Sequence, residues 1–259
     1  MTSLTPIVRQ ILFIWIGVWL ASVIAHLLSV PIGIFAFHPH WALAGELKAS
    51  IGLFSYPFFH DPGGFLHLFF NGWIFAFFAP EIERLYPGRK FCIFLGLTSL
   101  LGAFAHLLLT YFNPGLGFPI WGGSGLAMAA LGAFVAHFPR ATFNLFFFQP
   151  RVWVVFGVIC ALDALTLIAS IAGKTSAISS DVHLMGAVCG WLWGRGFQSQ
   201  WQFPGRQSLH QWKVGKVKRR DEASAFELDR ILAKISQKGI GSLTEGEKKF
   251  LEKQSKKGR

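Results

Sequence analysis

The amino-acid sequence predicts an all-α, polytopic membrane protein in which six transmembrane helices are followed by a small helical tail. Three observations carry this prediction. Hydrophobic residues make up 53% of the 259 positions, and charged residues only 14%, whereas about 25% of the residues of a soluble domain are charged. The mean hydropathy is +0.46. Apolar stretches that could form membrane-spanning helices also recur along the chain.

These apolar stretches place the helices. We expect spans at about residues 7–30, 65–79, 91–112, 124–137, 152–172 and 182–197, because about 20 apolar residues cross a bilayer. The first stretch is long enough to span, so we do not expect a cleaved signal peptide. The second, fourth and sixth are short, which suits helices shielded from lipid by their neighbours. Residues 31–64, rich in Phe, Trp, Pro and His, are expected to form a structured loop at the outer interface.

Basic residues predict the orientation, because they gather on the cytoplasmic side of membrane proteins. Of the 24 Lys and Arg residues, 16 lie in residues 195–259. Both termini are therefore expected in the cytoplasm. The inner side then receives the tail and Arg9, Arg84, Arg89, Lys90, Arg140 and Arg151, whereas the outer side receives only Lys48 and Lys174. Nucleic-acid binding is another interpretation of a basic tail, but no recognition motif is present, so no nucleic-acid partner is expected.

The change in composition divides the chain into a membrane domain (residues 1–198), a basic juxtamembrane linker (199–220) and a helical cytoplasmic tail (221–259). In the tail, apolar residues recur at helical spacing, at Leu228, Ile231, Leu232 and Ile235. Ser242 and Glu245 have the spacing of a capping box for a second helix. The tail is interpreted as a solvated helical hairpin, with a docking site for a partner or anionic lipid as the alternative.

The three cysteines, Cys92, Cys160 and Cys189, all fall inside apolar stretches. An odd number at these spacings gives neither a disulfide framework nor a set of metal ligands. We interpret them as packing residues and expect no metal and no cofactor.

A serine surrounded by glycines begins the fourth apolar stretch, in Gly122-Gly123-Ser124-Gly125. Glycine lets the backbone turn tightly and approach another chain closely. Ser124 would lie at a helix N-terminus, where free N–H groups and the helix dipole favour an oxyanion. The alternative is that Gly-Ser-Gly is only a close-packing motif.

His183 begins a helix with small residues every four positions, at Gly186, Gly190 and Gly194. The fourth stretch offers a matching small face at Gly125, Ala129, Gly132 and Ala136. Two such faces allow helices to approach closely. If they meet, Ser124 and His183 are neighbours at the outer ends of their helices, and the histidine can act as a general base. A lone histidine could instead be a packed, hydrogen-bonded residue.

His67 and Asn71 open the second stretch and share one helix face, because they are four residues apart. Both side chains can donate hydrogen bonds, as an oxyanion hole requires. The alternative is hydrogen bonding between helices only.

The three motifs together resemble those of the rhomboid family of intramembrane serine proteases. His67-x-x-x-Asn71, Gly122-x-Ser124-Gly125 and His183-x-x-Gly186-x-x-x-Gly190 occur in this order on the second, fourth and sixth spans. The resemblance covers about residues 50–198. Residues 227–251 also resemble cytoplasmic tails of some bacterial members.

The resemblance implies a six-helix rhomboid-like bundle with a Ser–His dyad that has no carboxylate partner. Ser124 would be the nucleophile and His183 the base, while His67, Asn71 and the Ser124 backbone N–H would bind the oxyanion. The loop between the first two helices would match the family's outer loop, and the fifth helix its lateral gate. Partners would be transmembrane protein substrates and the lipid bilayer, in a bacterial inner membrane.

Two positions depart from the family's pattern. Met128 stands where many relatives carry an aromatic ring, four residues after the serine, on which the catalytic histidine stacks; Val182 replaces the small residue usual before the histidine. Asp163, deep in the fifth span, has two interpretations. Intramembrane acids often mark function, but Asp163 is not on a motif helix, which favours a structural hydrogen bond. Asp181, His106 and His137 are interpreted as structural.

The function expected from these residues is an endopeptidase that cleaves transmembrane segments through an acyl-enzyme. A non-catalytic rhomboid-like protein that binds membrane clients is the alternative, although such relatives usually lack the serine or the histidine. A channel or transporter would need paired intramembrane charges or repeats, which the sequence does not show. A zinc-dependent intramembrane protease is disfavoured because no His-Glu-x-x-His motif occurs.

Overall fold

The computed structural model describes residues 3–142, 149–173 and 179–196, and parts of residues 230–251. The chain forms two compact units, Met1–Trp201 and Gln202–Arg259, which are considered separately. Within the described residues all regular structure is helical, apart from two isolated β-bridges. The predicted all-α class is therefore confirmed for this part of the chain.

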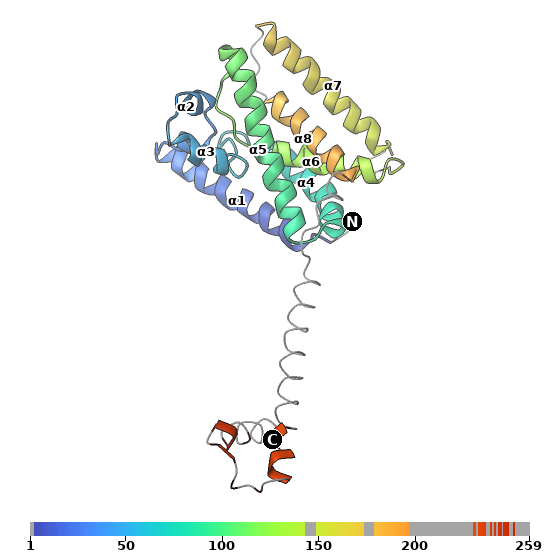
Figure 1. Ribbon diagram of the computed structural model, residues 1–259. Coiled ribbons are helices and arrows are strands. Elements are labelled where there is room, and N and C mark those ends of the chain that lie inside the picture. Colours follow the sequence, from blue (N-terminus) through green and yellow to red (C-terminus); the bar gives the residue numbers. More distant parts are fainter. Residues whose placement is uncertain are drawn as a thin grey trace. The chain divides into compact units, whose positions relative to one another are not determined.

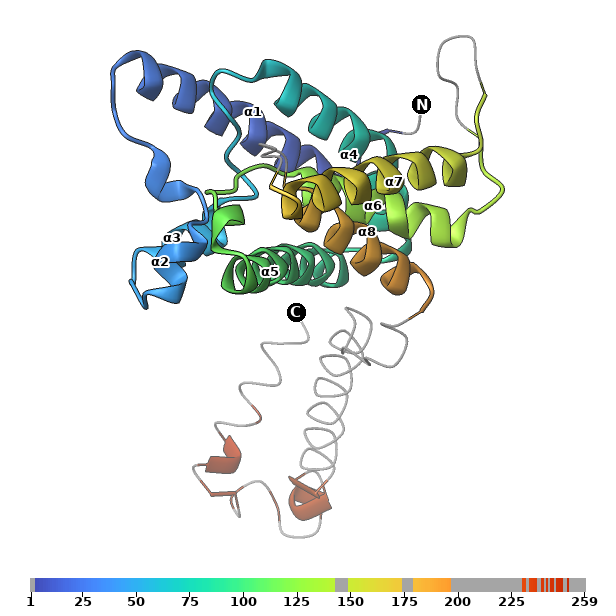
Figure 2. The same cartoon turned by 90° about the horizontal axis from the view of Figure 1, so that it is seen from above.

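Six helices of the first unit occupy the predicted apolar stretches (Figures 1 and 2). They are α1 (Pro6–Leu27), α4 (Phe65–Leu85), α5 (Arg89–Phe112), α6 (Ser124–His137), α7 (Val152–Ile171) and α8 (Ser180–Gly194). Four of them, α1, α4, α5 and α7, are long and apolar enough to cross a membrane, and α6 is a shorter apolar helix. The protein is a multi-pass membrane protein, whereas six crossings stay a prediction.

Helix α4 is longer than the sequence pattern indicated. It was expected to end near Ala79, but it runs 21 residues to Leu85, so the prediction of a short second helix is wrong. The cause lies at Pro80, which is buried inside the helix without ending it. The short lengths expected for α6 and α8 are confirmed, at 14 and 15 residues.

Helix α6 forms the centre of this unit. It packs along α8 and α4, and both views in Figures 1 and 2 place it among the other helices. Ten of its 14 residues are buried. Helix α7 contacts α8 and, less extensively, α6, and only Val152, Asp163 and Ser170 of its 20 residues are buried.

The segment between α1 and α4 is structured, as expected. It contains a 3₁₀ turn (Gly33–Phe35) and two short helices, α2 (Pro39–Leu43) and α3 (Ala49–Ser55). A two-bond bridge joins Phe37 to Ile120, with N–H to carbonyl distances of 2.9 and 3.0 Å. The segment therefore holds the chain that leads into α6, which follows the 3₁₀ turn Pro114–Leu116.

A carboxylate at the end of α4 caps the start of α1. Glu83 accepts hydrogen bonds from the backbone N–H groups of Ile7, at 3.0 Å, and Val8, at 2.9 Å, and from the Thr5 hydroxyl. Its side chain is buried. The first N–H groups of a helix have no partner within it, and a negative charge there also interacts favourably with the helix dipole. Glu83 thus links the start of α1 to the end of α4.

The described residues of the second unit contain a capping box, at Thr244 and Glu247. The Thr244 N–H donates to the Glu247 carboxylate at 2.8 Å, and the Glu247 N–H donates to the Thr244 hydroxyl at 3.3 Å. Hydrogen bonds from Lys234 and the Thr244 N–H lower the pKa of Glu247 to about 2. The pairing predicted for Ser242 and Glu245, and the contribution of Leu228 and Leu232, lie outside the described residues.

Candidate active site

Ser124 is the first residue of α6 and is partly exposed, whereas the residues on either side of it are buried. The turn into the helix requires glycine, because Gly122 has a φ of +127°. Two hydrogen bonds hold this turn: the Gly122 N–H donates to the Tyr56 carbonyl at 2.9 Å, and the Gly123 N–H donates to His60 Nε2 at 3.2 Å. Ser124 therefore lies at a fixed helix N-terminus, next to N–H groups that have no partner within the helix.

The small faces of α6 and α8 meet, as the spacing predicted. A Cβ atom added to Gly186 would lie 2.2 Å from the carbonyl oxygen of Gly125, and one added to Gly190 would lie 2.0 Å from that of Ala129. A Cβ atom added to Gly194 would lie 2.6 Å from Cβ of Ala136 and 2.8 Å from the carbonyl oxygen of Ala133. No side chain fits between the two backbones at these points, so the glycines set the separation of the helices.

His183 lies beside the start of α6, since Gly125 contacts the preceding residue, Val182. Its Nδ1 atom is 3.0 Å from Oδ1 of Asp163 on α7. The expectation that this histidine lacks a carboxylate partner is wrong, because α7 turns its one carboxylate toward α8. Within the described residues, no hydrogen bond joins the Ser124 hydroxyl to His183.

His67 and Asn71 approach the glycine turn from α4. A Cβ atom on Gly122 would lie 3.0 Å from His67 Nε2 and 3.7 Å from Asn71 Nδ2. The Asn71 side chain is buried, and its Nδ2 atom has no hydrogen-bond partner among the described residues. The structure thus brings parts of all three sequence motifs to one end of α4, α6 and α8.

A family model described as the Rhomboid domain matches residues 48–200. The chain belongs to the rhomboid family. A second model, described as a family of unknown function (DUF6576), matches residues 213–257. The comparison with curated proteins found no match. The match to the Rhomboid domain includes all three motifs and begins after α1, within the loop that leads to α4.

His60 is a residue of this rhomboid site that the sequence interpretation missed. It is fully buried, packs against Trp15 and His67 with ring centroids 5.2 and 5.4 Å away, and accepts the Gly123 hydrogen bond. Burial, reinforced by nearby His67, lowers the pKa of His60 to about 3. His60 is therefore neutral at physiological pH and can accept that bond. Its position seven residues before His67, in an apolar loop, was the available signal.

Trp15 of α1 also borders the glycine turn, although it precedes the matched Rhomboid domain. A Cβ atom on Gly123 would lie 2.0 Å from Cζ2 of its ring. The indole is fully buried. Nothing in the sequence distinguished Trp15 from the other nine tryptophans.

Other polar residues of the Rhomboid domain have structural partners. His106 Nδ1 is 2.8 Å from Asp181 Oδ2, and its Nε2 is 2.9 Å from the Phe118 carbonyl oxygen. His137 pairs with the Tyr86 hydroxyl at 2.7 Å and the Ala133 carbonyl at 2.9 Å. The structural interpretation of these residues is confirmed. Met128 is buried in the core, and Val182 lies against Gly102 and Gly125, where the absence of Cβ atoms makes room for its methyl groups.

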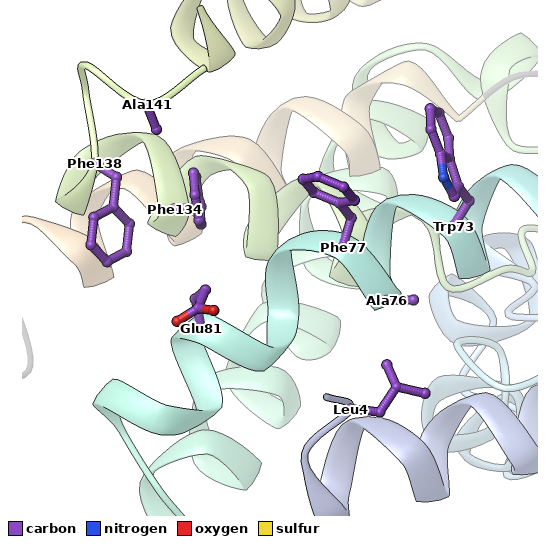
Figure 3. A pocket seen from close by; sticks show the side chains of 8 residues that line it. All are labelled: Leu4, Trp73, Ala76, Phe77, Glu81, Phe134, Phe138 and Ala141. Carbon is purple, nitrogen blue, oxygen red and sulfur yellow. The ribbon is translucent and has the colours of Figure 1, made fainter. Parts of the chain in front are cut away.

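Two cavities lie along α4, away from the four site residues. A groove of about 430 Å³ is lined by apolar side chains and one carboxylate, from Leu4, Trp73, Ala76, Phe77, Glu81, Phe134, Phe138 and Ala141 (Figure 3). A smaller apolar cavity of about 70 Å³ lies among α4, α6 and α7. In the part of the chain that the structure describes, no group of three or more His, Cys, Asp and Glu residues is arranged to bind a metal ion.

Proposed function

We propose that this rhomboid protein is a serine endopeptidase that cleaves transmembrane segments of other proteins within the membrane. The observation that carries the proposal is the meeting of three motifs at one end of α4, α6 and α8: His67 and Asn71 lie against the Gly122 turn, and Val182, next to His183, contacts Gly125. A nucleophile, a base and two hydrogen-bond donors are the groups that acyl transfer requires.

In the proposed reaction, Ser124 Oγ attacks the scissile carbonyl carbon while His183 Nε2 takes the hydroxyl proton. His183 then gives this proton to the leaving amine as the C–N bond breaks, which leaves an acyl group on Ser124. Water then attacks the acyl carbonyl carbon while His183 takes its proton, and His183 returns this proton to Ser124 Oγ as the ester bond breaks and the new carboxyl end is released. Ser124 and His183 end the cycle in their starting protonation states. The proposed reaction uses neither ATP nor a metal ion.

The oxyanion formed in each addition step would receive hydrogen bonds from the Ser124 N–H, His67 and Asn71. The unpaired Asn71 amide supports this role, because an unsatisfied buried donor costs about 1–3 kcal/mol and is seldom found without a reason. A donor already positioned for the transition state needs no reorganisation during the reaction.

Substrate helices would enter beside α7. This helix has few buried residues, and the small cavity among α4, α6 and α7 is lined only by apolar and aromatic residues, among them Trp73, Phe77 and Val155. A substrate helix must partly unwind before cleavage, since its carbonyl groups are hydrogen-bonded within the helix. Small or helix-breaking residues near the cleavage site are therefore expected to favour cleavage.

The remaining assignments rest on charge and family resemblance. We place the protein in a bacterial inner membrane with both termini in the cytoplasm, on the basis of the basic tail. Residues 1–198 would form the protease domain, 199–220 a basic linker and 221–259 the helical tail. The bilayer and transmembrane substrates are the proposed partners.

Purified protein in liposomes, incubated with a reporter that carries a transmembrane helix, tests the proposal. The wild-type protein should cut the reporter, and Ser124→Ala should not. Ser22→Ala is a matched control, because the buried Ser22 hydroxyl bonds only to the Val18 carbonyl of its own helix. If the wild-type protein leaves several reporters intact but captures them as well as Ser124→Ala does, the proposal fails and the client-binding alternative is favoured. One observation favours the client-binding alternative: among the described residues, no hydrogen bond joins Ser124 to His183.

A further inference from the structure

Two histidine–aspartate pairs lie in the membrane domain, and they differ in one respect. In the pair formed by His106 and Asp181, both ring nitrogens are occupied, one by the carboxylate and the other by the Phe118 carbonyl. In the pair formed by His183 and Asp163, the carboxylate contacts Nδ1 only, and Nε2 makes no hydrogen bond within the described residues. Both ring nitrogens of His106 therefore have partners, whereas among the described residues Nε2 of His183 has none and is available to accept a proton.

The geometry of the second pair favours one tautomer of His183. A carboxylate accepts hydrogen bonds, so a neutral His183 ring that donates to Asp163 through Nδ1, 3.0 Å away, carries its proton on that atom. In the neutral ring, Nε2 then holds the lone pair. This is the nitrogen that a general base needs when the hydroxyl it activates lies on the other side of the ring.

The two side chains of this second pair are largely buried. The side chains of His183 and Asp163 are 20% and 10% exposed, and Oδ2 of Asp163 has no hydrogen-bond partner among the described residues. An intramembrane carboxylate is costly and is retained where it has a partner or a function. No other charged residue occurs in α7, and its carboxylate is directed at His183.

We propose that Asp163 is a positioning residue: its carboxylate orients the His183 ring, holds the neutral ring in the tautomer whose Nε2 carries the lone pair, and stabilises the imidazolium that forms when His183 takes the Ser124 proton. In this role Asp163 does not take up the proton, which moves between Ser124 Oγ, the attacking water, Nε2 and the leaving amine. The inference rests on the proposed protease function and departs from the Ser–His dyad that the family resemblance implied. Because Asp163 belongs to the peripheral helix α7, the position of that helix also decides whether the base is correctly oriented.

The variants Asp163→Asn and Asp163→Glu test this role against a merely structural one. Asn keeps the size of the side chain but removes the charge, and Glu restores the charge. Asp181→Asn is the matched control, since it removes a second buried carboxylate that is paired with a histidine but does not contact His183. Should Asp163→Asn fail to fold, Asp163→Ser gives the same test with a smaller uncharged acceptor.

For each variant, kcat and KM for a transmembrane reporter are measured in liposomes, together with Tm and the rate at which a fluorophosphonate labels Ser124. Labelling depends on the activated serine but not on the entry of a substrate helix. Asp163→Asn should lower kcat and the labelling rate in parallel, by at least about 10-fold, with KM changed little. Asp163→Glu should recover part of both rates. Asp181→Asn should lower Tm and leave both rates within about twofold, because His183 keeps its partner.

The opposite results are equally clear. If Asp163 only ties α7 to α8, its removal frees the proposed gate, and Asp163→Asn cleaves as fast as the wild-type protein or faster; this result would overturn the inference. A fall in kcat without a fall in labelling would also overturn it, because the defect would then lie in substrate entry. If the wild-type protein is neither active nor labelled at Ser124, the proposed function itself fails, and the role of Asp163 fails with it.

Discussion

Helices α6 and α7 are both apolar, yet they are built in opposite ways. Helix α6 is short, rich in Ala and Gly, and almost entirely buried between α4 and α8. Helix α7 is longer and more hydrophobic, and within its most apolar 18 residues only 11% are buried. Apolar character therefore does not distinguish the centre of a membrane protein from its edge, because lipid is as apolar as a leucine side chain.

What distinguishes the two helices is the size of their side chains. At the centre, small residues let backbones approach and fix the distance between helices, as Gly190 does against Ala129. At the edge, large side chains such as Leu162 and Leu165 remain exposed on the protein surface. The candidate nucleophile lies on the more buried of the two helices, and the carboxylate that contacts its proposed base lies on the more exposed one.

The largest expected effect comes from filling the α6–α8 contact. Gly190→Leu would force α8 away from the Ala129 carbonyl and should destabilise the domain by about 3 kcal/mol or more. Gly157→Leu, on α7, is the matched control, because nothing lies within 4 Å of a Cβ atom there. Thermal unfolding in detergent measures both. Equal Tm values for the two variants would contradict the assignment of α6 as the fixed centre.

A smaller effect, on activity alone, is expected at the end of α4. Asn71→Ala should lower kcat by about 10²- to 10³-fold, the loss typical for one oxyanion donor. Stability should be unchanged or slightly higher, since the buried Nδ2 atom has no partner among the described residues. Reporter cleavage and Tm are measured together. A large fall in Tm with little loss of kcat would show that Asn71 is a packing residue.

Acid should weaken the support of the turn before α6. The pKa of His60 is lowered from 6.5 to about 3 on folding, so the unfolded chain binds a proton there first. Stability is then fully present above about pH 6.5 and falls, by up to about 1.4 kcal/mol per pH unit, as the pH drops toward 3.

His60→Gln keeps an acceptor for the Gly123 N–H and removes this titration. Unfolding measured between pH 7 and pH 4 should therefore show a shallower slope for the variant. Equal slopes of stability against pH for the two proteins would mean that His60 is accessible to protons in the folded protein. The contrast between a buried α6 and an exposed α7 would then be weaker at the N-terminal end of α6.

The smallest effect is expected on the lipid-facing side of α7. Leu165, 63% exposed, should tolerate replacement by Ala within about 0.5 kcal/mol. Leu131 of α6, 1% exposed, should lose about 2–5 kcal/mol in the same replacement, because a cavity forms. Unfolding of the two variants by denaturant gives the comparison directly. A similar loss of unfolding free energy at both positions would mean that Leu165 packs in an interface and does not face lipid.

The sequence predicted the parts of this molecule that depend on local spacing. Each apolar run became a helix, and glycines four residues apart brought α8 against α6 at Gly125 and Ala129. What it did not predict depends on tertiary contacts. Helix α4 continues through Pro80 because packing compensates for the missing hydrogen bond. The direction of Asp163 follows from how α7 is rotated against α8, which hydrophobicity alone does not determine, since nearly all its faces are apolar.

His60 and Trp15 were missed for a different reason. Each acts through the backbone of Gly123, one by accepting its N–H and the other by filling the space that a side chain would occupy. Every residue has backbone atoms, so the residue type at position 123 does not predict which side chains contact its backbone. The sequence indicated that the backbone can turn tightly at Gly123, but it did not indicate which distant residues contact this glycine.

Because Trp15 contacts Gly123, α1 borders the turn that precedes Ser124, the candidate nucleophile. A protein shortened to residues 48–200 would retain every motif but lose this indole and the helix that Glu83 caps. It would leave a space as large as a tryptophan ring beside the glycine turn, and a carboxylate without its two backbone donors. Water or lipid would enter there. The smallest working unit of this protein should therefore begin before Thr5, more than forty residues ahead of the sequence by which its family is identified.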